Sequence, residues 1–249
     1  MWKLGFILSF VIVLSVVGNP LSSVRDYSGF QVLRLYVKNI ESLLALNELQ
    51  DRGLYDFWKE PQLNSTTDIM VSPEQFLEIL TLIQKHNIEH EVMYQNLNLA
   101  IAAEQKGMVN RLGNQMNWNS YQRLETIYDW MDSLVKTHRV NQSIVSVEVE
   151  EIGESFEKRP MRVLKITRNW SVINGQNRSA IWLDGGIHAR EWIAPATVTY
   201  IANEIIQANL KSEYWASMFD WYISPVINPD GYEYSHTNDR FWRKTRSYP

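Results

Sequence analysis

Apolar and polar residues recur with two different periods along the first hundred residues, and together these periods predict a β-α-β-β-α-β unit. Alternating or β-branched and aromatic runs predict strands at 30–36, 54–58, 68–71 and 90–94. Helical spacing of apolar residues predicts helices over 39–49 and, carrying Phe76, Ile79, Leu80 and Ile83, after residue 72. Before the second helix, Ser72 and Gln75 have the spacing of a capping box, with Pro73 at the first helical position.

A third helical pattern covers residues 96–105, and Lys106-Gly107 is expected to end it. Residues 107–119 are polar and contain Gly113 and several asparagines, so they form the best linker candidate in the chain.

The pattern then restarts with an amphipathic helix over 124–134. Strands are predicted at 144–152, 161–166, 179–183 and 221–227, and a helix at 193–206. Asn228-Pro229-Asp230-Gly231 is a strong turn signal that should close the last strand. Strands that alternate with helices indicate an α/β sheet.

Composition narrows the classes of function. The chain has 249 residues, of which 45% are hydrophobic and 21% charged, as in an ordinary globular protein. Its net charge of −4 argues against a protein that binds nucleic acid through phosphate neutralisation. The absence of cysteine excludes thiol catalysis and thiolate metal ligands.

The first 18 residues have the features of a secretory signal peptide. Lys3 is followed by an apolar stretch over 4–17, which is short for a membrane span, and small residues precede position 19. The chain is therefore expected to be secreted and extracellular, without a membrane anchor once the signal is removed. Four Asn-x-Ser/Thr sequons suit this expectation, although such triplets also occur by chance; they are Asn64, Asn141, Asn169 and Asn177.

Candidate metal chemistry lies directly after the predicted strand at 179–183. His188 and Glu191 are a His-x-x-Glu pair, and Gly185-Gly186 lets the chain turn sharply before them. The ends of strands in α/β sheets are where ligands bind. Imidazole and carboxylate are zinc ligands, but a catalytic zinc normally takes three protein ligands and one water. Taken alone, the pair is a weak motif, and a surface histidine beside a helix-terminal glutamate is its more common meaning.

The flanking residues make the pattern specific. Gly-Gly-Ile-His-Ala-Arg-Glu-Trp-Ile at 185–193, Asn-Pro-Asp-Gly-Tyr-Glu-Tyr at 228–234 and Arg-Phe-Trp-Arg-Lys-Thr-Arg at 240–246 resemble metallocarboxypeptidases of the A/B type. The resemblance extends over 121–247, and the front β-α-β-β-α-β unit resembles the activation peptide of that family.

This resemblance implies an α/β protein with the following organisation. A ferredoxin-like activation peptide domain precedes the first half of an α/β/α carboxypeptidase domain with a mixed sheet. The implied segments are the signal peptide at 1–18, the activation peptide at 21–95, a connecting helix and linker at 96–118, and the catalytic part at 119–249.

The resemblance also implies roles for individual residues. His188 and Glu191 correspond to the first two ligands of a single zinc ion, and Arg243 to the arginine that polarises the scissile carbonyl and stabilises the oxyanion. Arg190 corresponds to a residue of a substrate subsite, and the substrates would be the C-termini of peptides or proteins. The other basic residues of the last motif are expected to form a solvated surface, namely Arg240, Lys244 and Arg246. The remaining histidines, which are His86, His90, His138 and His236, lack ligand spacing and are expected to be structural or exposed.

The family has its third zinc ligand, its glutamate base and its carboxylate-binding residues beyond the position that corresponds to Pro249. We therefore expect the 249-residue chain to be inactive by itself, whether it is an incomplete sequence or a truncated product. In a zymogen of this kind, a trypsin-like protease would cut the linker, and Lys106 and Arg111 are the candidate sites. Two alternatives remain: a non-enzymatic product whose front domain binds and inhibits a carboxypeptidase, and a degraded product without function.

Overall fold

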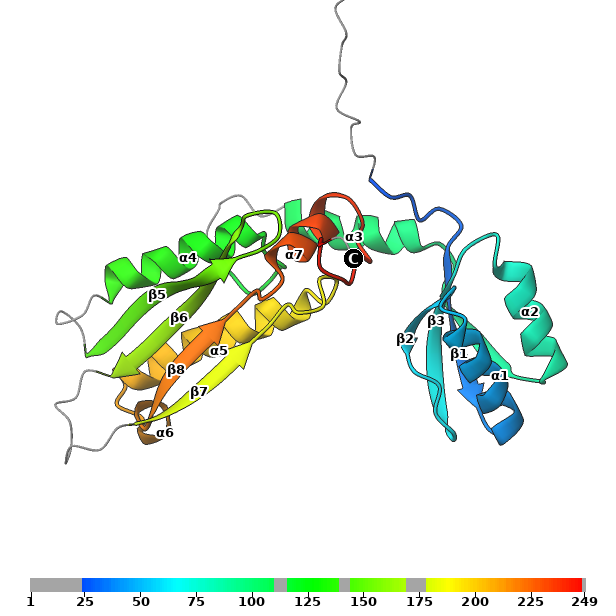
Figure 1. Ribbon diagram of the computed structural model, residues 1–249, viewed down its shortest axis with the longest axis horizontal. Coiled ribbons are helices and arrows are strands. Elements are labelled where there is room, and N and C mark those ends of the chain that lie inside the picture. The colour runs from blue at the N-terminus through cyan, green and yellow to red at the C-terminus, as the bar shows by residue number, and fades with distance from the viewer. Residues whose placement is uncertain (1–23, 110–115, 139–143, 169–177, 248–249) are drawn as a thin grey trace, which may run out of the picture.

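The computed structural model describes residues 24–109, 116–138, 144–168 and 178–247. The chain forms two units, one from residues 24–96 and one from residues 116–247, and a helix runs between them (Figure 1). We refer to residues 24–109, which include this helix, as the N-terminal unit and to residues 116–247 as the C-terminal unit. The predicted signal peptide and the sequons at Asn141, Asn169 and Asn177 lie outside the described residues.

The N-terminal unit has the predicted β-α-β-β-α-β order. Its elements are β1 (Gln31–Val37), α1 (Ile40–Asp51), β2 (Asp56–Lys59), β3 (Ser65–Val71), α2 (Phe76–Lys85) and β4 (Glu89–Tyr94). The strands form one antiparallel sheet in the order β2-β3-β1-β4. Alternate residues of β1 and β3, such as Leu33 and Ile69, pack against Leu46 of α1 and Ile79 of α2. The apolar faces of the strands and of the two helices thus form one hydrophobic core. The predicted ferredoxin-like fold is confirmed.

The predicted capping box forms only in part. Gln75 Oε1 accepts a hydrogen bond from Ser72 N at 3.0 Å, but the Ser72 hydroxyl donates to Glu74 instead of accepting from the backbone of Gln75. Residues 73–75 form a turn, and α2 begins at Phe76 rather than at Pro73.

Helix α3 (Leu97–Val109) connects the two units. The prediction that it ends at Lys106-Gly107 is wrong, because the helix continues for three residues beyond Lys106. A glycine inside a helix costs only about 1 kcal/mol relative to alanine, which neighbouring turns can outweigh.

The C-terminal unit contains a four-stranded mixed sheet. Its elements are α4 (Leu124–Thr137), β5 (Val145–Glu154), β6 (Pro160–Arg168), β7 (Ser179–Asp184), α5 (Ile193–Leu210), α6 (Tyr214–Ser217), β8 (Phe219–Ser224) and α7 (Pro229–Thr237). The order is β5-β6-β8-β7, in which only β7 and β8 are parallel. The predicted mixed sheet is confirmed, whereas the short helix α6 was not predicted.

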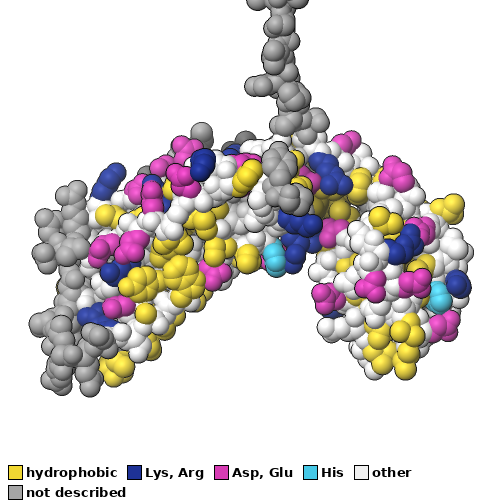
Figure 2. All heavy atoms as spheres, in the orientation of Figure 1, with side chains coloured by type: hydrophobic (Ala, Val, Ile, Leu, Met, Phe, Trp, Pro, Cys, Tyr) yellow, Lys and Arg dark blue, Asp and Glu magenta, His cyan; other side chains and the backbone are white. Residues whose placement is uncertain are grey.

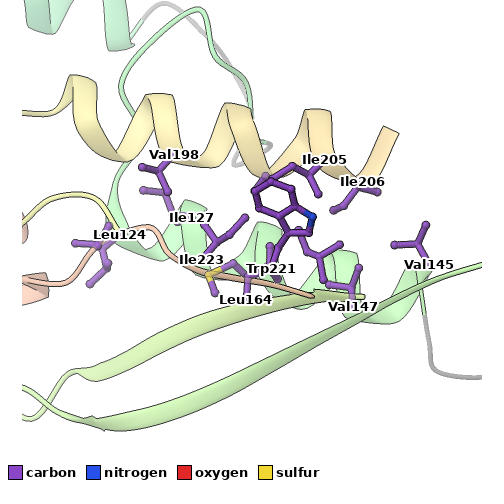
Figure 3. Packing of buried hydrophobic residues seen from close by; sticks show 14 of the residues in the cluster. Leu124, Ile127, Val145, Val147, Leu164, Val198, Ile205, Ile206, Trp221 and Ile223 are labelled. Atoms are coloured by element: carbon purple, nitrogen blue, oxygen red, sulfur yellow. The ribbon is translucent and has the colours of Figure 1, made fainter. Parts of the chain in front are cut away.

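The core of this unit lies between the sheet and the helices α4 and α5 (Figure 3). Ile127 from α4, Val198 and Ile205 from α5, and Leu164 and Ile223 from the sheet are almost completely buried in one cluster. This core holds β7 and β8 side by side, so the ends of both strands point to the same edge of the sheet.

The prediction of a turn at 228–231 is wrong, because these residues begin α7. β8 ends at Ser224, and Asn228 then caps the helix by accepting a hydrogen bond from Gly231 N at 3.0 Å. Pro229 occupies the first helical turn, where its missing N–H costs nothing. Asparagine followed by proline occurs both in turns and at the start of helices. The residues after Pro229 have too weak an apolar pattern to predict which of the two forms.

Strand β7 is less buried than its apolar sequence suggested. Trp182 on β7 is 48% exposed, and Ile187, Ile193 and Tyr200 nearby are exposed as well. Figure 2 shows hydrophobic side chains gathered on this face of the C-terminal unit. Among the described residues, no helix combines the length and the hydropathy that a membrane crossing requires.

Candidate functional site

The His188–Glu191 pair lies in the loop that follows β7. Gly185 is tied to the neighbouring strand because its N–H donates to Ser224 O at 3.0 Å and its carbonyl accepts from Ile227 N at 2.9 Å. A Cβ at Gly185 would lie 2.9 Å from Pro225 O, and Gly186 has a φ of +67°. Both positions therefore need glycine, one for close approach and one for its backbone conformation.

The turn brings the two predicted zinc ligands together. His188 Nδ1 lies 3.0 Å from Glu191 Oε1, and Glu191 N donates to His188 O at 3.1 Å. Their side chains are 36% and 49% exposed, so the pair is open to solvent. The donor types fit zinc, and both donor atoms converge on one point. Within the described ranges no third histidine or carboxylate joins them in a group that could hold a metal ion.

Arg243 approaches the same point from the segment after α7. Its Nη2 lies 3.4 Å from His188 Nδ1, and its carbonyl accepts a hydrogen bond from Ala189 N at 3.1 Å. Asn228 Nδ2 donates to both Ile187 O and Lys244 O, so one amide connects the histidine loop to the arginine segment. The structure thus assembles His188, Glu191 and Arg243 from two separate parts of the chain.

Gly231 allows the arginine segment to come this close. A Cβ at this position would lie 2.5 Å from Lys244 O, 2.6 Å from Asn228 Nδ2 and 2.9 Å from Ala189 Cβ. The motif at 228–231 therefore fixes the distance between the two loops of the site, a role that its turn-like sequence did not predict.

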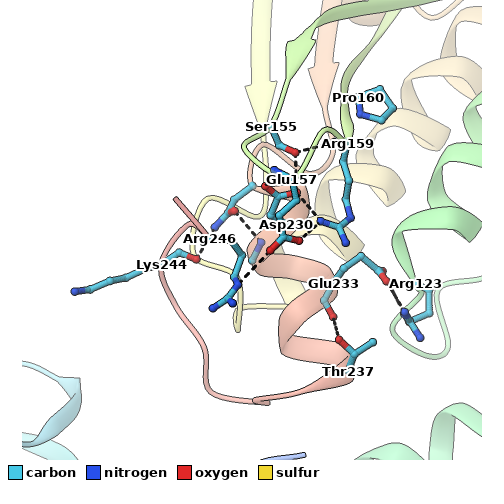
Figure 4. A network of polar contacts seen from close by, with 12 residues as sticks. Arg123, Ser155, Glu157, Arg159, Pro160, Asp230, Glu233, Thr237, Lys244 and Arg246 are labelled. Atoms are coloured by element: carbon cyan, nitrogen blue, oxygen red, sulfur yellow. Dashed lines mark hydrogen bonds and ion pairs between the residues drawn. The ribbon is translucent and has the colours of Figure 1, made fainter. Parts of the chain in front are cut away.

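A buried carboxylate joins the start of α7 to the β5–β6 hairpin (Figure 4). The Asp230 side chain is 3% exposed and accepts hydrogen bonds from Ser155 Oγ (2.7 Å), Glu157 N (2.8 Å) and Arg159 Nη1 (2.7 Å). Burial opposes ionisation, but these donors outweigh it and hold the pKa of Asp230 below its usual value. The β5–β6 hairpin is thereby fastened to the start of α7.

Two basic residues that were expected to be solvated are instead packed. Arg246 lies 3.7 Å from the ring centroid of Tyr234, and its Nε is 3.4 Å from Glu157 Oε1. Arg240 lies 3.6 Å from the ring centroid of Trp192. The expectation was wrong for both because aromatic faces, brought near by folding, offer the guanidinium groups a better environment than water alone. Lys244 is exposed, as expected.

The N-terminal unit contacts the site through two ion pairs. Arg190, the predicted subsite residue, forms a two-pronged pair with Asp56 at the start of β2, with Nη2 to Oδ1 at 3.0 Å. Arg240 forms a similar pair with Glu104 of α3, at 2.6 and 2.9 Å, and also donates to Arg190 O at 2.8 Å. Both arginine side chains are 14% exposed.

A cavity of about 620 Å³ remains between the two units. Arg190 and Arg243 line it from the C-terminal unit, and Asp56 and Phe30 line it from the N-terminal unit. The N-terminal unit therefore faces the arginine side of the candidate site, whereas His188 and Glu191 do not line this cavity and stay open to solvent.

The remaining predicted residues have simpler positions. His236 stacks on Trp192 with ring centroids 3.8 Å apart, and burial, with the nearby Arg123 and Arg240, lowers the pKa of His236 to about 3. His86 contacts Glu41, and His90 is exposed. Lys106 is exposed near the end of α3, whereas Arg111 lies outside the described residues.

Comparisons with known families identify both units. A family model described as "Zinc carboxypeptidase" matches residues 127–249, and one described as "Carboxypeptidase activation peptide" matches residues 33–104. Zinc carboxypeptidase A 1 of Anopheles gambiae is 33% identical over 237 residues, which cover 94% of this chain and 52% of that protein. Carboxypeptidase A1 of Bos taurus is 33% identical over 248 residues, which cover 95% of this chain and 57% of that protein.

Solved structures show the same relationship. Carboxypeptidase A from Helicoverpa armigera has a TM-score of 0.77 at 19% identity, covering 90% of this chain and 54% of that one, which supports the fold alone. Thrombin activatable fibrinolysis inhibitor has a TM-score of 0.69 at 25% identity, covering 88% and 55% respectively. The chain spans about half the length of the curated relatives it matches. With an activation peptide in front of zinc carboxypeptidase sequence, the chain belongs to the zinc carboxypeptidase family.

Proposed function

We propose that the chain is part of a secreted, zinc-dependent carboxypeptidase zymogen that, once activated, removes C-terminal amino acids from peptides. The observation that carries this proposal is the convergence of His188 Nδ1, Glu191 Oε1 and the Arg243 guanidinium on one solvent-accessible point. All three positions match the family motifs, and the first two have the donor chemistry that zinc requires.

Each residue has a distinct task in the proposed reaction. His188 and Glu191 would hold the zinc ion, which when bound supplies Lewis-acid activation of water and of the scissile carbonyl. Arg243 stabilises the negative charge that develops on the carbonyl oxygen, because its guanidinium stays charged and its backbone is held in place. The Arg243 carbonyl accepts from Ala189 N, and the carbonyl of the next residue, Lys244, accepts from Asn228 Nδ2. Arg190 binds the substrate chain when it is not paired with Asp56.

In the zymogen state, the N-terminal unit occupies Arg190, the residue proposed to bind substrate, and is held there by a second ion pair at Arg240. Asp56 presents a carboxylate to Arg190, and Glu104 presents another to Arg240. Activation would require a cut between the two units by a trypsin-like protease. Lys106 lies inside α3, so a cut there requires the last turn of the helix to unwind, and Arg111 is the other candidate site.

N-terminal sequencing after brief trypsin treatment tests this activation step. The new N-terminus should follow Lys106 or Arg111. A first cut inside residues 30–95 would count against the N-terminal unit as a removable activation domain.

For the 249-residue chain by itself, we expect weak zinc binding and no carboxypeptidase activity. Two protein ligands bind zinc less tightly and fix its geometry less well than three. Competition with a chromogenic chelator should show zinc affinity that falls in His188→Ala and Glu191→Gln. Zinc-dependent release of C-terminal residues by the purified chain would contradict the expectation of inactivity.

Secretion is tested separately by glycosylation. Asn64 is exposed in the loop between β2 and β3, where an oligosaccharide would project into solvent. Expression in a eukaryotic secretory system should give a product in the medium whose mobility changes with peptide N-glycosidase. Asn64→Gln should remove one glycan, and retention of the whole product inside the cell would argue against the signal peptide.

A second candidate function is inhibition of a complete carboxypeptidase by the free N-terminal unit. The pairs that Asp56 and Glu104 make with Arg190 and Arg240 favour it, since they dock this unit on carboxypeptidase residues. Titration of an active carboxypeptidase with residues 21–111 distinguishes the candidates. Inhibition that is lost in Asp56→Asn would support the inhibitor.

A further inference from the structure

The segment ahead of β1 makes its own contact with the C-terminal unit, apart from the two ion pairs at Arg190 and Arg240. Arg25 N donates to Asn238 O at 2.7 Å, and Arg25 Nη1 lies 3.0 Å from Asp239 Oδ2. The Tyr27 hydroxyl donates to Asp239 Oδ1 at 2.5 Å. We call residues 24–30 the leading segment.

Tyr27 is the centre of this contact because it is both buried and packed. The residue is 1% exposed, and its ring meets Phe30 and Phe241 edge-on, each with centroids 5.0 Å apart. Trp58 from β2 stacks on the same Phe241 ring at 5.2 Å. Burial and the bond to Asp239 both raise the pKa of Tyr27, so its hydroxyl remains a donor at physiological pH.

Asp239 needs its partners in the leading segment. Its side chain is 8% exposed, and a buried carboxylate is costly unless hydrogen bonds satisfy it. Among the described residues, the other donor to this carboxylate is Phe241 N, at 3.0 Å from Oδ1, while Asp239 O accepts from Trp242 N at 2.9 Å. These two bonds form the turn that leads to Arg243. If Tyr27 moved away, the buried Asp239 carboxylate would lose a hydrogen-bond donor directly beside the candidate site.

The Arg25 pair contributes less than the Tyr27 bond. The Arg25 side chain is 54% exposed, and solvent-exposed ion pairs add little to stability. The strength of this contact should therefore depend mainly on the tyrosine hydroxyl and its aromatic surroundings.

We propose that Tyr27 and Asp239 form a latch that keeps the N-terminal unit bound to the C-terminal unit after the chain between them is cut. The surface around Asp239 and Phe241 is then a binding site for the leading segment of this same chain. Dissociation of the latch, rather than the cut, determines when Arg190 and Arg240 become free. The role of this contact in activation rests on the proposed zymogen function, but the binding of the leading segment to Asp239 and Phe241 does not.

The test uses the full chain with residues 110–115 replaced by the recognition sequence of a site-specific protease. The C-terminal unit is immobilised, the chain is cut, and the loss of the N-terminal unit into flowing buffer is recorded. Tyr27→Phe removes only the hydroxyl. Tyr55→Phe is the matched control, because the Tyr55 hydroxyl makes an equally short 2.5 Å bond to Glu78 inside the N-terminal unit.

The cut parent should dissociate slowly, and Tyr27→Phe should dissociate about tenfold faster or more, as expected for loss of a hydrogen bond to a charged group. Tyr55→Phe should dissociate like the parent. In the background of Asp239→Asn, the additional Tyr27→Phe change should have a much smaller effect, because the two residues act through one bond.

Immediate separation of the cut parent would overturn the latch. So would equal dissociation rates for Tyr27→Phe and the parent, or equal acceleration by Tyr55→Phe. The readout needs neither zinc nor activity, so failure of zinc binding at His188 and Glu191 would refute the proposed function and leave this result standing.

Discussion

Asp230→Asn tests how strongly the buried network between α7 and the β5–β6 hairpin supports the C-terminal unit. The substitution keeps the size of the side chain but removes its charge and places an NH2 group where a donor already points. Ser155 Oγ, Glu157 N and Arg159 Nη1 all donate to this carboxylate within 2.8 Å. Hydrogen bonds to a charged group contribute about 1.5–3 kcal/mol each, and asparagine can keep one acceptor, so we expect a loss of about 2–4 kcal/mol at pH 7.

The same substitution has a defined pH dependence. The pKa of Asp230 is lower in the folded chain than the ordinary value of an aspartate carboxyl, because its three hydrogen-bond donors outweigh the effect of burial. Its stabilisation is therefore complete above the unfolded pKa and is lost as the pH falls through the lower, folded pKa. The difference in unfolding free energy between the parent and Asp230→Asn should be constant above about pH 5 and should shrink below about pH 4.

Urea unfolding followed by tryptophan fluorescence measures this difference at a series of pH values. Asp129→Asn is the control, because Asp129 is exposed on α4, and it should change the stability by less than about 0.5 kcal/mol at every pH. A cost for Asp230→Asn that stays the same from neutral to acidic pH would refute the reasoning, since the effect would then not come from the charge.

Three further predictions concern packing, close approach and stacking. Leu164→Ala should cost about 2–5 kcal/mol in unfolding free energy because Leu164 is fully buried, whereas Leu77→Ala, at a residue 77% exposed, should be nearly neutral by the same urea assay. Gly231→Ala should destabilise the chain by about 1–3 kcal/mol or more, since its Cβ would lie 2.5 Å from Lys244 O, and calorimetry that shows an unchanged melting temperature would contradict this. Arg240→Lys should weaken the contact with α3, because lysine cannot make both bonds to Glu104 while it stacks on Trp192. Trypsin should then cleave the chain near Lys106 faster, and an unchanged cleavage rate would contradict this prediction.

The sequence predicted the features of the fold that depend on local periodicity. The strand at Gln31–Val37 and the helix at Leu124–Thr137 were evident because each buries one regular face. The residues at 228–231 were misinterpreted because turns and helix N-termini favour the same residue types. The apolar run in β7 suggested burial, but burial depends on what covers a strand, which its own residues do not specify.

The candidate site was predictable in part for a similar reason. His188 and Glu191 are three positions apart, and their distance follows from the local turn. The pairing of Arg190 with Asp56 joins residues 134 positions apart and leaves no local pattern. Arg246 was misinterpreted because a basic run is usually solvated, and the ring of Tyr234 that shields it is brought near only by the fold.

Three residues, Tyr27 ahead of β1, Asp56 at the start of β2 and Glu104 on α3, contact the C-terminal unit from separate parts of the chain. When one contact breaks, the other two keep its partners near each other at a high effective concentration, so the broken contact forms again quickly. The N-terminal unit should therefore leave in one concerted step rather than peel away. In a population of cut molecules, the N-terminal unit would then be either fully bound or fully released, with few intermediates that keep only some of these contacts.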